Sequence, residues 1–194
     1  MSNDAGSAGE SARAARVAAA VALFTPAERE AILALRRGLH AEPELSWQER
    51  GTQTRLVAAL AHAGITDVRV IADTGLVATI PGTRPGAPVI ALRGDTDALP
   101  ITEETGLPFA SRNPGVMHAC GHDMHATWAV AAGILLRKNP AAGEVRLILQ
   151  PAEEVGEGAP KVLESGALSG VHAIFGAFVL RTIEDLLFVF DLPP

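Results

Sequence analysis

The 194-residue sequence contains one cysteine, Cys120, and no tyrosine. A single thiol cannot form an internal disulfide, which excludes a disulfide-stabilised scaffold, and a lone free thiol indicates the reducing cytoplasm. Aromatic residues make up only 4% of the chain, whereas hydrophobic residues make up 48%. We therefore expect a folded domain whose core consists of small aliphatic side chains, and we do not expect disorder throughout.

Basic clusters and long apolar runs are also lacking. The net charge is -6, and no run of Lys and Arg is present that would neutralise phosphates, so we expect no nucleic-acid partner. No apolar stretch approaches the roughly 20 residues needed to span a bilayer, so we expect no membrane association. The apolar segment 17–24 faintly resembles a signal peptide, but acidic residues precede it, and we interpret it as a helix.

Predicted strands and helices alternate along the chain. Residues 1–11 are small and polar and predict a disordered tail. We expect helices over 12–23, 26–41, 47–63, 123–137 and 158–166, and strands over 67–72, 76–80, 88–93, 144–149 and 171–179. This alternation predicts an α/β domain with a mainly parallel or mixed sheet flanked by helices.

Three polar clusters lie where a predicted strand ends or a helix begins. Asp95 and Asp97 follow the strand over 88–93, residues 118–125 precede a helix, and Glu153 and Glu154 follow the strand over 144–149. Open α/β sheets bind ligands beyond the carboxyl ends of their strands. The three clusters therefore predict one shared site.

The middle cluster has the chemistry of a metal site. Cys120 and His122 flank Gly121, which lets the backbone turn both side chains inward. Zinc and similar ions bind thiolate, imidazole and carboxylate, and a mixed set of these ligands is typical of a catalytic site. A lone cysteine is more often a small buried hydrophobe.

Three more residues of this cluster favour the ligand interpretation of the cysteine. They are His118, Asp123 and His125. Because histidines and carboxylates often orient metal ligands through hydrogen bonds, His118 and His125 are candidates for that role. Each of them is equally well explained as an ordinary core or surface histidine.

The carboxylate pairs allow two interpretations each. Glu153 and Glu154 form either a solvated surface pair or a functional pair, in which one binds metal and the other acts as general base. Asp95 and Asp97 either cap turns or ligate metal and orient ligands, with Arg93 balancing their charge. The position of all four at strand ends favours the functional interpretation.

Together these segments resemble the M20 metallopeptidase family. The resemblance rests on the motifs Arg93-x-Asp95-x-Asp97-Ala98-Leu99-Pro100, His118-Ala119-Cys120-Gly121-His122-Asp123-x-His125 and Gln150-Pro151-Ala152-Glu153-Glu154, and on Arg36-Arg37-x-Leu39-His40-x-x-Pro43-Glu44-Leu45. It extends from about residue 28 to 176. The branch most similar contains hippurate hydrolases, auxin-conjugate amidohydrolases and N-acyl-amino-acid deacylases.

The resemblance implies a zinc-exopeptidase-like domain with two divalent metal ions, usually zinc, manganese or cobalt. It implies that Cys120, His122 and Glu154 are metal ligands and that Glu153 activates water. In this interpretation Asp95, Asp97, His118, Asp123 and His125 have supporting roles. The implied reaction is hydrolysis of the amide bond of an N-acyl amino acid or small peptide.

The sequence departs from the family after Gly176. The family pattern has a metal-binding His where this chain has Phe178, and residues 179–194 form a divergent, apolar tail. The family's dimerisation or lid domain and its last metal-binding His would lie beyond residue 194. We therefore expect residues 12–194 to be a truncated catalytic domain, incomplete at its C-terminus, with little activity. If copies of this chain associate into homo-oligomers, we expect the contact to form through an exposed sheet edge or the apolar tail.

Two other functions fit the sequence. Cys120 can be the nucleophile of a thiol amidase with a nearby His as base, a reaction that chelators would spare. The chain can also be a non-catalytic remnant that binds a metal or a partner.

Overall fold

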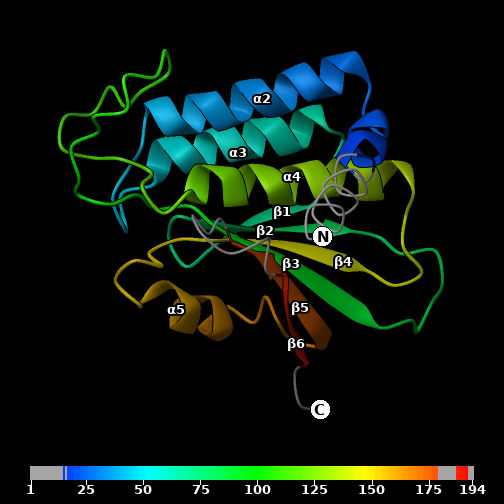
Figure 1. Ribbon diagram of the computed structural model, residues 1–194. Coiled ribbons are helices and arrows are strands. Elements are labelled where there is room, and N and C mark those ends of the chain that lie inside the picture. Colours follow the sequence, from blue (N-terminus) through cyan, green and yellow to red (C-terminus); the bar gives the residue numbers. More distant parts are fainter. Residues whose placement is uncertain (1–14, 16, 179–186, 192–194) are drawn as a thin grey trace, which may run out of the picture.

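The computed structural model describes residues 15, 17–178 and 187–191, which form one sheet with helices on both faces (Figure 1). The helices are α2 (Pro26–Ala41), α3 (Arg50–His62), α4 (His122–Lys138) and α5 (Gly158–Glu164). The strands are β1 (Val68–Ile71), β2 (Gly75–Ile80), β3 (Val89–Asp95), β4 (Val145–Gln150), β5 (Val171–Ala177) and β6 (Leu187–Asp191). Residues 17–22 are also helical.

The sheet has the strand order β1-β2-β4-β3-β5-β6. Strand β3 runs parallel to β4 and β5, whereas the pairs β1–β2, β2–β4 and β5–β6 are antiparallel. The α/β class is thus confirmed, and of the two predicted sheet types the mixed one is correct. The parallel pairs occupy the centre of the sheet. Helices lie in the connections between their strands, as parallel pairing requires.

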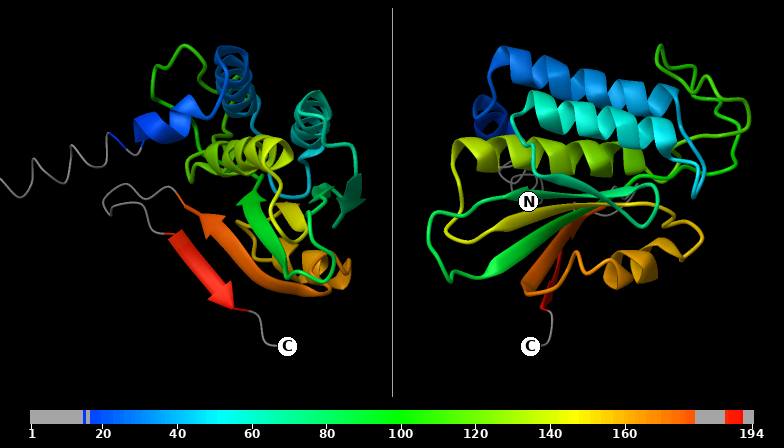
Figure 2. Two further views of the ribbon diagram at one scale, coloured as in Figure 1. Left: turned by 90° about the vertical axis from the view of Figure 1, so that its right-hand side faces the viewer. Right: turned by 180° about the vertical axis from the view of Figure 1, so that it is seen from behind.

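Helices α2, α3 and α4 cover one face of the sheet and α5 covers part of the other (Figures 1 and 2). Successive residues of a strand point to opposite faces. In β4, Leu147 and Leu149 accordingly pack in the core under the three helices, whereas Ile148 packs with Val162 of α5. The near-continuous apolar run of β4 is explained by burial on both faces.

Helix α2 begins where the sequence predicts, because Thr25 and Glu28 form a capping box with Pro26 at the first helical position. The predicted start of α3 at residue 47 is wrong by three residues. Trp47 has a left-handed backbone (φ 66°), and the carboxyl group of Glu44 accepts hydrogen bonds from the N–H groups at the start of the helix. A side chain outside the helix therefore sets its first turn.

Strand β3 extends two residues beyond its predicted end, so that Asp95 lies in the strand and pairs with Gln150. Its backbone lies against the first turn of α4. A Cβ atom at Gly94 would be only 2.5 Å from the carbonyl oxygen of His125, so no larger residue fits there. This close approach brings the end of β3 to the residues that begin α4.

The loop between β3 and α4 is closed at its base. Leu99 and Met117 exchange backbone hydrogen bonds, each 3.0 Å long. Most of the residues between them are exposed. These two bonds fix the backbone at Met117, three residues before Cys120, and so help to set the position of Cys120.

The C-terminal predictions have mixed outcomes. The strand predicted over 171–179 ends at Ala177, and residues 187–191 of the divergent tail form β6, a strand that the sequence did not predict. The predicted disordered tail over 1–11 and the rest of 179–194 lie outside the described residues. No helix among the described residues has the length and apolar character to cross a membrane. Association through the sheet edges, β1 and β6, stays a prediction.

We expect Gly94→Ala to destabilise the fold by about 1–3 kcal/mol, because the added methyl group forces β3 and α4 apart. Gly38→Ala is the control: its Cβ would meet nothing within 4 Å in the interior of α2, and it should stabilise by about 0.5–1 kcal/mol. Urea unfolding of both variants checks this. An equal effect of the two substitutions would contradict the close approach.

Candidate metal centre

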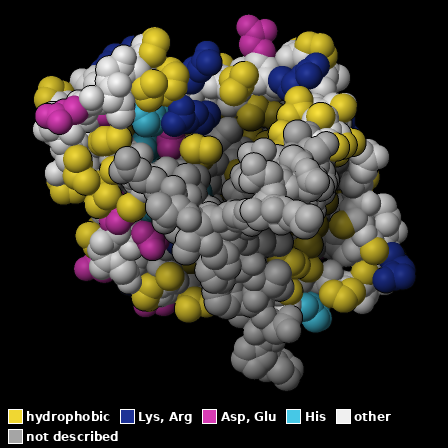
Figure 3. Space-filling model, viewed as in Figure 1, with side chains coloured by type: hydrophobic (Ala, Val, Ile, Leu, Met, Phe, Trp, Pro, Cys, Tyr) yellow, Lys and Arg dark blue, Asp and Glu magenta, His cyan; other side chains and the backbone are white. Residues whose placement is uncertain are grey.

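The start of α4 and the loop after β4 meet at the carboxyl ends of β3 and β4. Cys120 from the turn before α4, His122 from its first residue and Glu154 from the loop after β4 place one potential ligand atom each within 4.8 Å of one another. Figure 3 shows histidine, acidic and basic side chains close together on the upper left of the visible face, the end where α4 begins in Figure 1. The sequence predicted this convergence.

His122 is held by a backbone contact. Its side chain is 4% exposed, and its Nδ1 lies 2.9 Å from the carbonyl oxygen of Asp97, which can only accept a hydrogen bond. Nδ1 therefore carries the proton. Nε2 lies 3.6 Å from Glu153 Oε2 and 3.6 Å from Glu154 Oε1. In the neutral ring, this second nitrogen has a free electron pair directed among carboxyl groups, as in a metal-binding histidine.

Asp97 links the segments around this histidine. Its carboxylate accepts hydrogen bonds from Ser46 Oγ at 2.7 Å and from the N–H of Glu154 at 3.0 Å. Burial acts to raise the pKa of Asp97, but the His122 ring, whose Nδ1 lies 3.3 Å from Oδ1, and these two bonds outweigh it and lower the pKa to about 2. Asp97 is thus a fixed negative charge that sets the positions of its neighbours.

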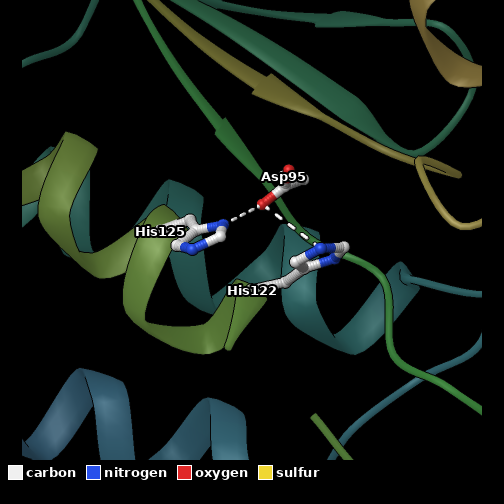
Figure 4. A group of neighbouring side chains, drawn as sticks. All are labelled: Asp95, His122 and His125. Carbon is white, nitrogen blue, oxygen red and sulfur yellow. Dashed lines mark hydrogen bonds and ion pairs between the residues drawn. The ribbon is translucent and has the colours of Figure 1, made fainter. Parts of the chain in front are cut away.

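A second group of potential ligands consists of Asp95, His122 and His125 (Figure 4). His125 Nδ1 lies 2.5 Å from Asp95 Oδ1, and Arg93 Nη1 lies 2.8 Å from Asp95 Oδ2. Burial acts to raise the pKa of Asp95, but these two partners hold it below its ordinary value. Both oxygens of Asp95 already have cationic or donor partners, so the group with Cys120 is the better cation site.

The group of Cys120, His122 and Glu154 fits a divalent cation by its chemistry. Glu154 Oε1 is buried and accepts no hydrogen bond from the described part of the chain. The neighbouring Glu154 carboxyl group, together with partial burial, raises the pKa of the Cys120 thiol to about 12. The thiol therefore keeps its proton until a metal ion displaces it. Thiolate, imidazole and carboxylate together are a zinc-type ligand set.

Glu153 differs from its neighbour Glu154 in exposure. The side chain of Glu153 is 38% exposed, against 17% for Glu154. Burial and the charge of Asp95 raise the pKa of Glu153. A carboxyl group that is open to solvent, with a raised pKa, is suited to proton transfer.

Two residues predicted to support the centre have other surroundings. Asp123 accepts from His40 Nδ1 at 2.8 Å and pairs with Arg36 Nε at 2.9 Å, so that it joins α4 to α2. His118 is buried, and among the described residues neither of its ring nitrogens has a hydrogen-bond partner. Burial lowers the pKa of His118 to about 4. Neither side chain is hydrogen-bonded to Cys120, His122 or Glu154 in the described chain.

Phe178 lies at the edge of the centre. Its ring centroid is 5.5 Å from that of His125 in an edge-on arrangement, and the guanidinium group of Arg93 lies 5.7 Å from it. A side chain at this position thus reaches the ion pairs around Asp95. His172, the histidine that precedes Phe178 in the sequence, is remote from the centre. It is exposed and accepts a hydrogen bond from the N–H of Val89, at the opposite end of β3.

Two residues of the site were not predicted from the sequence: Ser46, which donates to Asp97, and Glu49, which is buried. Both belong to the short segment between α2 and α3. The available signal was the polar character of this segment next to His40 and Pro43. Long-range contacts of this kind have no periodicity that a sequence would display.

We expect the stability of the metal-free protein to fall between pH 4 and pH 2 partly because Asp97 is protonated there. A folded-state pKa of about 2, lowered from 3.8, contributes stability above pH 4 that is lost as the pH falls toward 2. Asp97→Asn should therefore be less stable than the wild type at pH 5, by an amount that shrinks toward pH 2. Urea unfolding across this range measures it, and a constant difference would contradict the assignment.

Comparison with known proteins gives concordant results. The family model "Peptidase family M20/M25/M40" matches residues 91–186. The chain is 47% identical over 147 residues to an N-acetyl-L-cysteine deacetylase of Bacillus subtilis and 43% identical over 162 residues to thermostable carboxypeptidase 1 of Saccharolobus solfataricus. These matches cover 75% and 81% of this chain, but only 35% and 41% of the relatives.

A solved structure shares the fold. The Bacillus subtilis protein described as a dinuclear metal binding peptidase from the M20 family superposes with a TM-score of 0.71 at 48% identity, over 74% of this chain and 41% of that one. The chain therefore spans well under half the length of each of these three proteins. By the family model, these identities and the shared fold, the chain belongs to peptidase family M20/M25/M40.

Proposed function

We propose that this chain carries the metal-binding part of an active site that hydrolyses the amide bond of N-acyl amino acids or small peptides. The observation that supports this most directly is the convergence of Cys120, His122 and Glu154 within 4.8 Å. The names of the relatives, a deacetylase and a carboxypeptidase, agree with this reaction. The lone thiol fits a cytoplasmic location.

In this proposal Cys120, His122 and Glu154 hold the cation, and Asp97 fixes the His122 ring through its backbone carbonyl group. A divalent cation, when bound, polarises the amide carbonyl group and lowers the pKa of water. Zinc, manganese and cobalt all accept this ligand set. A family member with two metal ions is known among the similar structures.

Glu153 is the proposed general base. It faces His122 Nε2 at 3.6 Å and is partly open to solvent. Its carboxylate would take a proton from the attacking water and return it to the leaving amine, for which its raised pKa is suited. The products would be a carboxylic acid and an amino acid.

The thiol amidase is less well supported, because the surroundings of Cys120 do not favour its thiolate. A catalytic thiol needs a lowered pKa, usually from a neighbouring cation or an adjacent base. Glu154 instead raises the pKa of Cys120 to about 12. Such a thiol is a poor nucleophile by itself and a good ligand once a cation displaces its proton.

The adjacent glutamates allow a matched test. We expect Glu154→Gln to lower Zn²⁺ affinity at least about 100-fold, because it removes a charged ligand. Glu153→Gln should retain Zn²⁺ and lose the low hydrolytic activity toward an N-acetyl amino acid that is expected of the wild-type chain. Affinity of the wild type should rise with pH, since the cation displaces the Cys120 proton. Isothermal titration calorimetry and an amine-release assay, with and without chelator, measure these quantities.

The other outcomes separate the alternatives. Zn²⁺ binding to the wild type without hydrolysis would favour the non-catalytic metal-binding module. Hydrolysis that survives chelation would favour the thiol amidase. Equal loss of Zn²⁺ in both Gln variants would contradict the division of roles between Glu153 and Glu154.

Phe178 offers an independent test. Because its ring lies beside His125, an imidazole at this position would add a nitrogen ligand near the centre. We expect Phe178→His to raise Zn²⁺ affinity at least about 10-fold. Phe175→His, within β5, is the control and should leave the affinity unchanged. An unchanged affinity in Phe178→His would show that position 178 does not reach the cation.

A further inference from the structure

Glu49 is a buried acidic residue outside the proposed ligand set. Its exposure is 0%, and it directly precedes α3. Its Oε1 accepts the N–H of Ala152 at 2.9 Å, and its Oε2 accepts the hydroxyl of Thr74 at 2.6 Å. Both oxygens are thus used, and one of the two bonds goes to the loop that carries the active-site glutamates.

Ala152 has an unusual backbone conformation. Its φ is 49°, in the left-handed region that non-glycine residues rarely adopt. It is fully buried and immediately precedes Glu153 and Glu154. A strained residue at such a place persists only when its surroundings over-determine it.

Two contacts of the Ala152 backbone hold this turn. The N–H group donates to Glu49, and the carbonyl group accepts the N–H of Gly158 at 3.0 Å. At Gly158 a Cβ would lie 1.7 Å from the carbonyl oxygen of Pro151, so the returning chain packs directly on the turn. Of the two donor–acceptor contacts, only that with Glu49 depends on a side chain.

The turn determines where the two glutamates lie. After Ala152 the chain reverses, so that the N–H of Glu154 reaches Asp97 Oδ2 at 3.0 Å and Glu154 Oε1 lies 3.6 Å from His122 Nε2. An extended Ala152 would direct the following residues elsewhere. The position of Glu154 in the centre therefore depends on the conformation of Ala152.

We propose that Glu49 is a positioning residue: its buried carboxyl group holds Ala152 in the left-handed conformation and thereby aims Glu153 and Glu154 at His122. This inference rests on the proposed function for the roles of the two glutamates. A positioning role differs from a general contribution to stability. The loss of metal affinity on removing Glu49 should be relieved by any change that lets residue 152 adopt positive φ more easily.

The test uses the whole chain and Co²⁺ as the metal probe. We expect Glu49→Ala to lower Co²⁺ affinity about 10- to 100-fold, as for other residues that act through a ligand. Adding Ala152→Gly to this variant should recover at least about fivefold, because glycine adopts positive φ without strain. The visible spectrum of bound Co²⁺ should change in Glu49→Ala and return toward the wild type in the double variant.

Glu44→Ala is the matched control. The Glu44 carboxyl group accepts the N–H groups of Gly51 and Thr52 at the start of the same helix and makes no bond to Ala152. It should lower the melting temperature and leave Co²⁺ affinity unchanged. If Glu49→Ala does not fold, Glu49→Gln, which keeps an acceptor for Ala152, should show a loss of a few-fold that Ala152→Gly also relieves.

Unchanged Co²⁺ affinity in the Glu49 variants, or no recovery with Ala152→Gly, would overturn the inference. A wild type that binds no Co²⁺ would instead refute the proposed function. In that case hydrogen exchange of the Ala152 amide in the metal-free chain tests whether Glu49 holds the Ala152 backbone. Faster exchange in Glu49→Ala but not in Glu44→Ala would support the inference, and unchanged exchange would overturn it.

Discussion

The backbone of β3 lies so close to the first turn of α4 that position 94 has room only for glycine. This contact places the end of β3 beside the residues at which α4 begins. Asp95 thereby meets His125, and the carbonyl group of Asp97 meets His122. The proposed metal centre depends on this packing, because Asp97, which follows β3, contacts both His122 and the N–H group of Glu154.

Four carboxyl groups converge on this site, from Asp95, Asp97, Glu153 and Glu154. Arg93 pairs with Asp95, and the ring nitrogens of His122 lie within 3.6 Å of a carboxyl oxygen of all four. The two aspartates have donors that lower their pKa, whereas the pKa values of Glu153 and of the Cys120 thiol are raised. A bound divalent cation would lower the pKa values of Glu153 and Cys120 as well, since it is the largest local charge in such a site.

The sequence predicted those features that depend on local chemistry. The capping box at Thr25, the buried strand β4 and the polar residues at the strand ends all have local signals, and the positions of Cys120, His122 and Glu154 agree with the predicted cluster. The start of α3, the antiparallel edge strands and the roles of Ser46 and Glu49 depend on partners distant in the chain. Tertiary contacts of this kind override local preferences and cannot be predicted from motif spacing.

The hydrogen-bonded base formed by Leu99 and Met117 sets residues 100–116 apart from the segment that carries Cys120 and His122. The entropic cost of closing a loop grows only slowly with its length, so lengthening this loop should destabilise the fold little. Residues 104–110, which are mostly exposed, can therefore accept an inserted peptide or a small domain while Cys120 and His122 keep their positions. Such an insertion site lies on the same end of the molecule as the centre, where a grafted segment would be well placed to alter which substrates enter.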